Sequence, residues 1–255
     1  MDLIGDGLRE AFWLLVHNRN GVYEIALRSI EVSGVATLVS LVLGVSAGAF
    51  LAFKRFPGRL IALTLVNTGM GFPPVVIGLI VAILLWRSGP LGDLGWIYTT
   101  KAMIIAQTAI ATPVITGFTA ASLSALDPRL RLQLYALGAS RLQALWLLLL
   151  EVRLPLLAAI MAGFGAAISE VGASVMTGGN IAGQTRVLTG AILLEQSKGN
   201  FGTALALGII LLAMMVAVNL LFTWVQLGAR RQRAAAAPAQ EDAPRVATLT
   251  PWPRS

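Results

Sequence analysis

The sequence contains no cysteine and only one histidine among its 255 residues. Without cysteine there can be no disulfides, thiolate metal ligands or cysteine nucleophiles, and the lone His17 gives no basis for a metal site. Charge is scarce as well: 12% of the residues are charged, whereas 56% are hydrophobic and the mean hydropathy is +0.78. Such a composition is typical of a chain surrounded by lipid.

Further absences narrow the class of protein. No Gly-x-x-x-x-Gly-Lys-Ser/Thr phosphate loop occurs, so we do not expect this chain to hydrolyse ATP by itself. The apolar segments hold no paired carboxylates, and we assign no catalytic residues. Only one acidic residue, Glu170, lies well inside a predicted span, whereas gradient-driven carriers typically combine ionisable relays with inverted repeats. This pattern argues against a secondary carrier or channel, which is kept as the alternative from another class.

Five long apolar segments are present, and a spanning helix needs about 20 mostly apolar residues. The pattern predicts an all-α membrane protein with about five transmembrane helices, at 30–53, 60–86, 103–123, 154–175 and 203–227. Proline should kink the second span at Pro73-Pro74 and break the third at Pro113. A short amphipathic pattern at 7–17 predicts an N-terminal interfacial helix.

These segments suggest a simple partition of the chain. We expect an interfacial helix and linker at 1–24, a transmembrane domain at 25–228, and a disordered cytoplasmic tail rich in alanine and proline at 229–255. Lys and Arg outnumber Asp and Glu by 19 to 12, but they cluster beside apolar segments, which favours a topological role over nucleic-acid binding. The richer clusters, at 54–59, 127–153 and 230–233, predict that the N-terminus lies outside and the C-terminus inside.

A more polar stretch at 127–153 predicts a protruding helix-turn-helix on the cytoplasmic face. Asp127 can cap a helix that has Pro128 in its first turn, and the Leu-Gly-Ala step at 137–139 allows a sharp bend into a second helix. Such an element can dock into a groove of a partner protein. The residues that we expect to carry the docking are Arg131, Leu132, Gln133, Tyr135, Leu137, Gly138, Ala139, Ser140 and Arg141.

This stretch resembles the cytoplasmic coupling loop of ABC importer permeases, in which Glu-Ala-Ala is followed by three residues, a glycine and a downstream Leu-Pro. Leu137-Gly138-Ala139 and Leu154-Pro155 match that pattern, whereas Leu132-Gln133-Leu134 stands in place of Glu-Ala-Ala and Leu-Pro lies about one helical turn further on. The stretches at 71–78, 87–92 and 169–181 are similar to the molybdate/tungstate branch, with tungstate-type members nearest. The resemblance covers roughly 25–227.

The resemblance implies a type I ABC importer permease in a bacterial or archaeal inner membrane. It implies a homodimer, separate ATPase subunits that use ATP and magnesium, an extracytoplasmic oxyanion-binding protein, and no cofactor on this chain. Transport would proceed by alternating access. The expected cargo is an oxyanion, tungstate first, and molybdate, sulfate or another small solute remains open as the alternative because the binding protein usually sets selectivity.

Several residues are candidates for a pathway or gate. Glu170 either pairs with a neighbouring helix or backbone group or forms part of a gate, and a direct anion ligand is disfavoured because a carboxylate repels an oxyanion. The glycine-rich loop at 178–186 could line the pathway through its backbone N–H groups, could be an ordinary turn, or could dock the binding protein. The full set is Pro73, Pro74, Glu170, Gly178, Gly179, Asn180 and Thr185.

Overall fold

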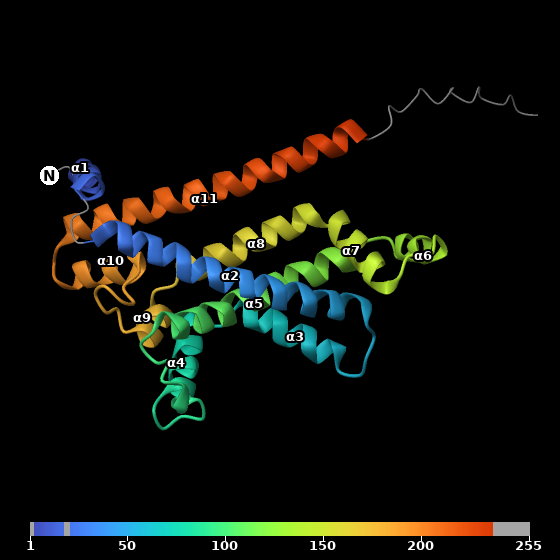
Figure 1. Ribbon diagram of the computed structural model, residues 1–255, viewed down its shortest axis with the longest axis horizontal. Helices are drawn as coiled ribbons and strands as arrows, with labels where there is room; N and C mark the ends of the chain where they lie inside the picture. The colour runs from blue at the N-terminus through green and yellow to red at the C-terminus, as the bar shows by residue number, and fades with distance from the viewer. Residues whose placement is uncertain (1–2, 18–20, 237–255) are drawn as a thin grey trace, which may run out of the picture.

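The computed structural model describes residues 3–17 and 21–236, and all regular secondary structure in these ranges is helical (Figure 1). The all-α prediction is therefore confirmed. The elements are α1 (Leu3–His17), α2 (Val22–Phe53), α3 (Arg59–Met70), α4 (Pro74–Leu85), the short 3₁₀ turn η2 (Gly92–Leu94), α5 (Thr100–Ser124), α6 (Pro128–Ala136), α7 (Arg141–Glu151), α8 (Arg153–Ile168), α9 (Gly172–Gly178), α10 (Leu188–Ser197) and α11 (Phe201–Ala236).

Three helices are long and apolar enough to cross a membrane by themselves: α2, α5 and the Phe201–Trp224 part of α11. Two bent pairs, α3 with α4 and α7 with α8, raise the number of candidate spans to five if each pair counts as one. Helices α3 and α4 have 12 residues each, or about 18 Å, and neither alone covers a hydrocarbon core of about 30 Å. The prediction of about five spans is consistent with this count.

The second predicted span is not a kinked helix but two helices that meet at 104°. Helix α3 ends at Met70, and α4 begins with Pro74 in its first turn and Pro73 extended before it. Two successive prolines remove two backbone donors and hold the residue before them out of the helical region, so no helical hydrogen bonds bridge the junction. Helix α4 consequently projects away from the bundle (Figure 1).

The predicted break in the third span is wrong, because α5 runs without interruption through Pro113. The Ser40 hydroxyl of α2 and the Thr112 hydroxyl both donate to the Thr108 carbonyl, at 3.2 and 2.7 Å. The proline ring itself lies against Gly69 of α3. Packing against α3 and hydroxyl hydrogen bonds to the neighbouring carbonyl thus accompany the proline within an uninterrupted helix.

The fourth predicted span, 154–175, is also shorter than expected. Helix α8 ends at Ile168, and residues 169–171 separate it from the short α9. Glu170 consequently lies in a break between two helices, and the prediction that it sits inside a spanning helix is wrong. The pattern could not reveal this break because the segment is apolar on both sides of it.

Helices α2 and α5 pack along their length and form the centre of the molecule with α8 (Figure 1). Small residues allow this approach: any side chain on Gly44 would meet Ile115, and any on Gly48 would meet Thr119. These two glycines therefore allow α2 and α5 to pack closely within the bundle.

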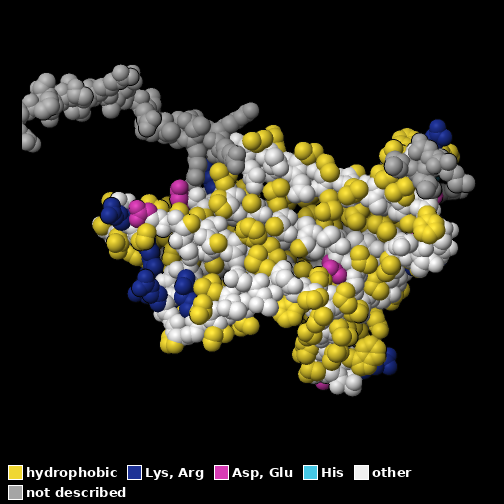
Figure 2. Space-filling view, turned by 180° about the vertical axis from the view of Figure 1, so that it is seen from behind, with side chains coloured by type: hydrophobic (Ala, Val, Ile, Leu, Met, Phe, Trp, Pro, Cys, Tyr) yellow, Lys and Arg dark blue, Asp and Glu magenta, His cyan; other side chains and the backbone are white. Residues whose placement is uncertain are grey.

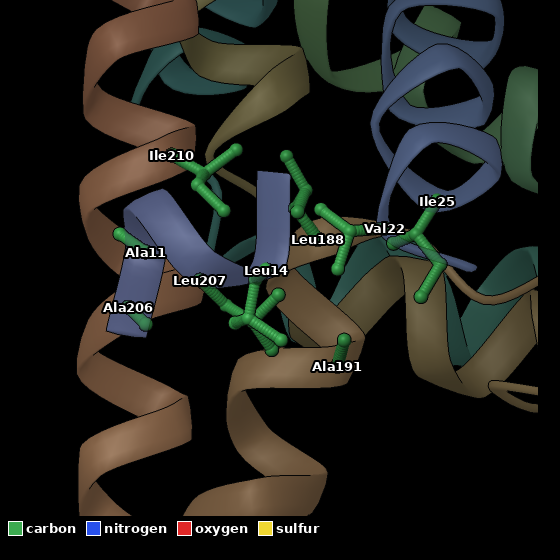
Figure 3. Packing of buried hydrophobic residues seen from close by; sticks show 9 residues of the cluster. All are labelled: Ala11, Leu14, Val22, Ile25, Leu188, Ala191, Ala206, Leu207 and Ile210. Carbon is green, nitrogen blue, oxygen red and sulfur yellow. The ribbon is translucent and has the colours of Figure 1, made fainter. Parts of the chain in front are cut away.

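Helix α1 packs on the protein through its apolar face. Figure 3 shows Ala11 and Leu14 against Ala206 and Leu207 of α11, within a buried cluster that also includes residues of α2 and α10. The Thr203 hydroxyl of α11 donates to the Glu10 carboxylate at 2.7 Å. The helix predicted at 7–17 exists. Its apolar side packs against α11, so that this side contacts protein and is not free to face only the membrane interface.

The predicted domain limits differ from the helix ends. Helix α2 begins at Val22 rather than near 30, because 22–29 continue the apolar helical pattern. Helix α11 continues to Ala236, into the segment expected to be a disordered tail, and residues 237–255 lie outside the described residues.

Candidate functional site

A helical hairpin, formed by α6 and α7, protrudes from one end of the molecule (Figure 1). The Asp127 carboxylate accepts a hydrogen bond from the backbone N–H of Arg129 at 2.8 Å, and Pro128 occupies the first turn, as predicted. Helix α7 begins with a complete capping box between Ser140 and Gln143. Both helix starts are therefore fixed by local sequence.

The turn between these helices is a Schellman motif. The N–H of Ala139 donates to the Leu134 carbonyl and the N–H of Gly138 to the Tyr135 carbonyl, each at 3.0 Å. Gly138 has φ +84°, a left-handed conformation that other residues adopt at a cost. The geometry of the turn therefore favours glycine at this position.

The hairpin has an inner and an outer face. Leu130, Leu134 and Leu145 pack towards a buried cluster that includes Leu123 and Leu148. On the outer face, Leu137 at the tip is 84% exposed and Leu132 is 67% exposed. Among the predicted docking residues, Leu132, Gln133, Tyr135, Leu137, Gly138, Ser140 and Arg141 are exposed, while Arg131 and Ala139 are partly covered.

A second region surrounds α9, which crosses α4 at close range. Any side chain on Gly78 of α4 would overlap the backbone of Ala173, and any on Gly172 would meet Val75. The predicted gate residues Pro73 and Pro74 start α4 just beside this crossing. The broken helix and α9 thus meet through backbone contact.

Glu170 serves as a cap for α9. Its carboxylate accepts a hydrogen bond from the Ala173 N–H at 3.0 Å, and the Thr189 hydroxyl donates to its backbone carbonyl at 3.1 Å. The side chain is half-buried and next to the α4 crossing. Among the alternatives left open by the sequence, this contact favours pairing with a neighbouring backbone group.

The glycine-rich loop after α9 is closed by its own hydrogen bonds. The buried Thr185 hydroxyl donates to the Gly178 carbonyl and accepts from the Ile181 N–H, while the Asn180 side chain donates to the Gly190 carbonyl at 2.8 Å. Internal acceptors also occupy the N–H groups of Gly179, Gln184, Thr185 and Arg186. Those N–H groups are therefore engaged within the loop, and side chains dominate what it offers to a ligand.

A cavity of about 900 Å³ opens between α4 and α9. Trp86 and Tyr98 stand edge to face at its wall, with ring centroids 6.1 Å apart. Of the predicted gate residues, only Gly179 lines this cavity. The others divide between the two ends of α9: Pro73, Pro74 and Glu170 at its start, and Gly178, Asn180 and Thr185 at its end.

The model of a known family, described as the inner membrane component of binding-protein-dependent transport systems, matches residues 40–231. This chain belongs to that family. It is therefore a multi-pass inner-membrane transport component, and the family prediction made from the coupling-loop pattern is confirmed.

Curated relatives support the same branch. The chain is 38% identical over 209 residues to a probable anion ABC transporter permease protein of Haloferax volcanii, covering 80% of this chain and 90% of that one. It is 36% identical over 219 residues to the tungstate uptake system permease protein TupB of Peptoclostridium acidaminophilum, covering 86% and 96%. The molybdenum transport system permease protein ModB of Escherichia coli is 25% identical over 212 residues, covering 80% and 93%.

Solved structures share the fold. The methionine ABC transporter MetNI in inward-facing conformations matches with a TM-score of 0.58 and 22% identity, over 88% of this chain and 96% of that one. An amino acid ABC transporter matches with a TM-score of 0.58 and 17% identity, over 86% and 98%. The fold is thus that of type I ABC transporter permeases.

Sequence reasoning missed one polar contact inside this transport component. Gln107 of α5 is 2% exposed and donates from its side-chain amide to the Ser174 hydroxyl of α9 at 3.1 Å, while its amide oxygen has no hydrogen-bond partner among the described residues. A lone amide within an apolar segment is a signal that points to such a contact. It ties the α9 region to the central helix α5.

Proposed function

We propose that this chain is the permease subunit of an ATP-driven oxyanion importer and that tungstate is its cargo. The observation that carries the proposal is the protruding hairpin, capped at both helix starts, on a chain whose relatives include tungstate, molybdenum and anion permeases. The relatives supply the class of cargo and the hairpin supplies the means of coupling.

The hairpin would couple the chain to a separate ATPase subunit that binds ATP and magnesium. Leu132 and Leu137 present apolar side chains to the outside, and exposed apolar residues at a rigid tip suit insertion into a groove of a partner. Because α7 joins α8 at a 74° bend, a push on the tip would tilt α8 relative to the membrane. This motion is the basis for the alternating access that we propose.

The partners follow from the same scheme. A second copy of the chain would face the apolar surface around α4, which Figure 2 shows densely covered with hydrophobic side chains. An extracytoplasmic oxyanion-binding protein would deliver tungstate at the end opposite the hairpin. In this orientation the N-terminus lies outside and the C-terminus inside.

The gate would lie where α4 meets α9. Pro73 and Pro74 hold the start of α4 at the bend, and Glu170 fixes the start of α9. Gly178, Gly179, Asn180 and Thr185 hold the other end of α9, next to the 900 Å³ cavity. A change in the α4–α9 crossing would open or close the route between two copies.

The test is uptake by proteoliposomes that contain this chain, its ATPase and its binding protein. We expect ATP-dependent uptake of tungstate in preference to molybdate and sulfate. Leu137→Asp should abolish uptake and ATPase stimulation, because it places a charge in an apolar contact, whereas Leu137→Met should retain both. A strong preference for sulfate would overturn the cargo, and full coupling in Leu137→Asp would overturn the docking role.

A further inference from the structure

A separate groove of about 390 Å³ lies between the end of α2 and the hairpin, outside the gate region. Most of its wall is apolar and comes from one face of α2 and the inner side of α7. The lining residues are Val45, Ser46, Ala49, Phe50, Phe53, Lys54, Arg131, Tyr135, Arg141, Leu145, Leu148 and Leu149.

Three cations, Lys54, Arg131 and Arg141, line this groove, and no carboxylate does. Within the described ranges, none of the three forms an ion pair with Asp or Glu. Figure 2 shows Lys and Arg gathered at this end of the molecule. The groove therefore combines an apolar wall with uncompensated positive charge.

Arg131 is held in place by aromatic rings. Its guanidinium lies 4.9 Å from the Phe53 ring centroid and 5.5 Å from that of Tyr135, and its Nε lies 3.2 Å from the Tyr135 hydroxyl. Lys54 similarly lies 5.5 Å over the Phe50 ring. Stacking fixes the guanidinium while leaving its other N–H donors available for an anion.

The position of the groove points to its ligand. Helix α2 is apolar over its spanning part and ends at Phe53, so Lys54 marks the boundary between hydrocarbon and water. An inorganic oxyanion would gain nothing from the apolar wall. A molecule with a phosphate and hydrocarbon chains satisfies both parts, and basic pockets beside membrane helices at the cytoplasmic face bind such headgroups.

We propose that this groove binds an anionic phospholipid. Its phosphate would contact Lys54, Arg131 and Arg141, and an acyl chain would lie along Ala49 and Leu149. The lipid would bridge α2 and the hairpin, so that membrane composition sets how firmly the hairpin is held. Arg131 and Arg141 would then bind the lipid headgroup in addition to their proposed role in docking the ATPase.

Native mass spectrometry of the full-length chain in detergent tests this site, with phosphatidylglycerol and phosphatidylcholine of identical acyl chains as probes. We expect preferential retention of phosphatidylglycerol. Arg131→Gln and Arg141→Gln should each lower that preference about fivefold, the effect of about 1 kcal/mol per cation near an anionic headgroup, without changing phosphatidylcholine binding. Ser46→Trp should reduce binding of both lipids by filling the groove.

Arg129→Gln is the matched control, since it removes one charge from the same helix at a residue that does not line the groove. It should leave lipid binding unchanged. Equal retention of the two lipids, an equal loss in Arg129→Gln, or displacement of phosphatidylglycerol by equimolar inorganic phosphate would each overturn the proposal. So would undiminished lipid binding in the Arg131 and Arg141 variants combined with lost ATPase binding. No cargo is measured, so this outcome is independent of the proposed transport function.

Discussion

Gly138 is the residue on which the shape of the hairpin tip depends. Its left-handed conformation costs about 1–2 kcal/mol for most residues, more for β-branched ones, whereas asparagine tolerates it. We therefore expect Gly138→Val to reduce ATP-dependent uptake at least about tenfold, and Gly138→Asn to retain most of it. Uptake by proteoliposomes, with membrane abundance measured in parallel, checks this. Equal uptake in the two variants would contradict the assigned turn.

Glu170 offers a way to separate a structural from a functional role. Its contact with the Ala173 N–H needs only an acceptor, which glutamine supplies and alanine does not. Loss of a helix cap costs about 0.5–2 kcal/mol, so Glu170→Ala should lower the Tm in detergent while Glu170→Gln should not. A fall in uptake by Glu170→Gln at unchanged Tm would show that the negative charge itself serves the gate. If both variants lower the Tm equally, the capping role is wrong.

Among the elements, the crossing of α4 and α9 is the contact most sensitive to side-chain size. Gly78→Ala places a methyl group against the Ala173 backbone, where neither helix can yield without moving the other. We expect destabilisation by about 1–3 kcal/mol, measured as a lower Tm. The matched control is Gly34→Ala in α2, where nothing lies within 4 Å of the added atom and Tm should stay the same or rise. A neutral Gly78→Ala would show that the two helices are not in contact.

The turn from α10 to α11 should make the stability of the protein depend on pH. The Lys198 ammonium and the Asn200 amide, each hydrogen-bonded to the Glu195 carboxylate at 2.8 Å, hold the pKa of Glu195 below its ordinary value. A lowered pKa in the folded state means that the contribution to stability is complete above the ordinary pKa and is lost as the pH falls through the folded-state value. Glu195→Gln should therefore narrow the Tm difference between about pH 7 and about pH 3.5. An unchanged difference would contradict this assignment.

The local signals in this chain predicted local structure well. Asp127 with Pro128, and the Leu-Gly-Ala step, sufficed to predict the hairpin because caps and turns depend on neighbouring residues. The prolines had two different outcomes: Pro73 and Pro74 lie at a bend of 104°, while Pro113 stays within an uninterrupted helix. Packing against α2 and α3 decides the latter case, and the sequence does not reveal which helices will be neighbours.

The candidate site was predictable only in part, again because the sequence does not reveal which helices lie next to each other. The seven proposed gate residues lie around α9, but their separation into two groups at its ends depends on the break at 169–171. The segment is apolar on both sides of Ser169-Glu170, so hydropathy alone does not signal that break. The cavity beside Trp86 and Tyr98 likewise arises from the projection of α4, which follows from the size of the bend.

At the scale of the whole molecule, the hairpin and the α9–α10 loop lie at opposite ends (Figure 1). The chain has no cysteine, so single substitutions can report which end faces the cytoplasm. Ala136 and Ala182 are both exposed. In intact cells, a membrane-impermeant maleimide should label Ala182→Cys and not Ala136→Cys, and permeabilisation should make both reactive. The reverse pattern would overturn the proposed orientation.

Helix α11 stands apart from the tightly packed centre. Only 17% of its spanning window is buried within the chain, against 50% for that of α5. Its main contacts are with α1 and α10 at one end (Figure 1). Most of this helix is therefore open to lipid or to another subunit, whereas α2, α5 and α8 pack on one another at the centre of the molecule.

If the hairpin docks an ATPase as proposed, the Schellman turn at its tip also bears on how importers in one membrane avoid binding each other's ATPase. Because the N–H groups of Leu137, Gly138 and Ala139 are hydrogen-bonded within the hairpin, the exposed side chains of Leu132 and Leu137 dominate what the tip offers to a partner. A groove built for an acidic residue would bury an unpaired polar group against leucine, at a cost of about 1–3 kcal/mol. With the ATPase docked in this way, mismatched pairs would be about 5- to 150-fold weaker than matched ones, and each permease would bind its own ATPase in a mixture.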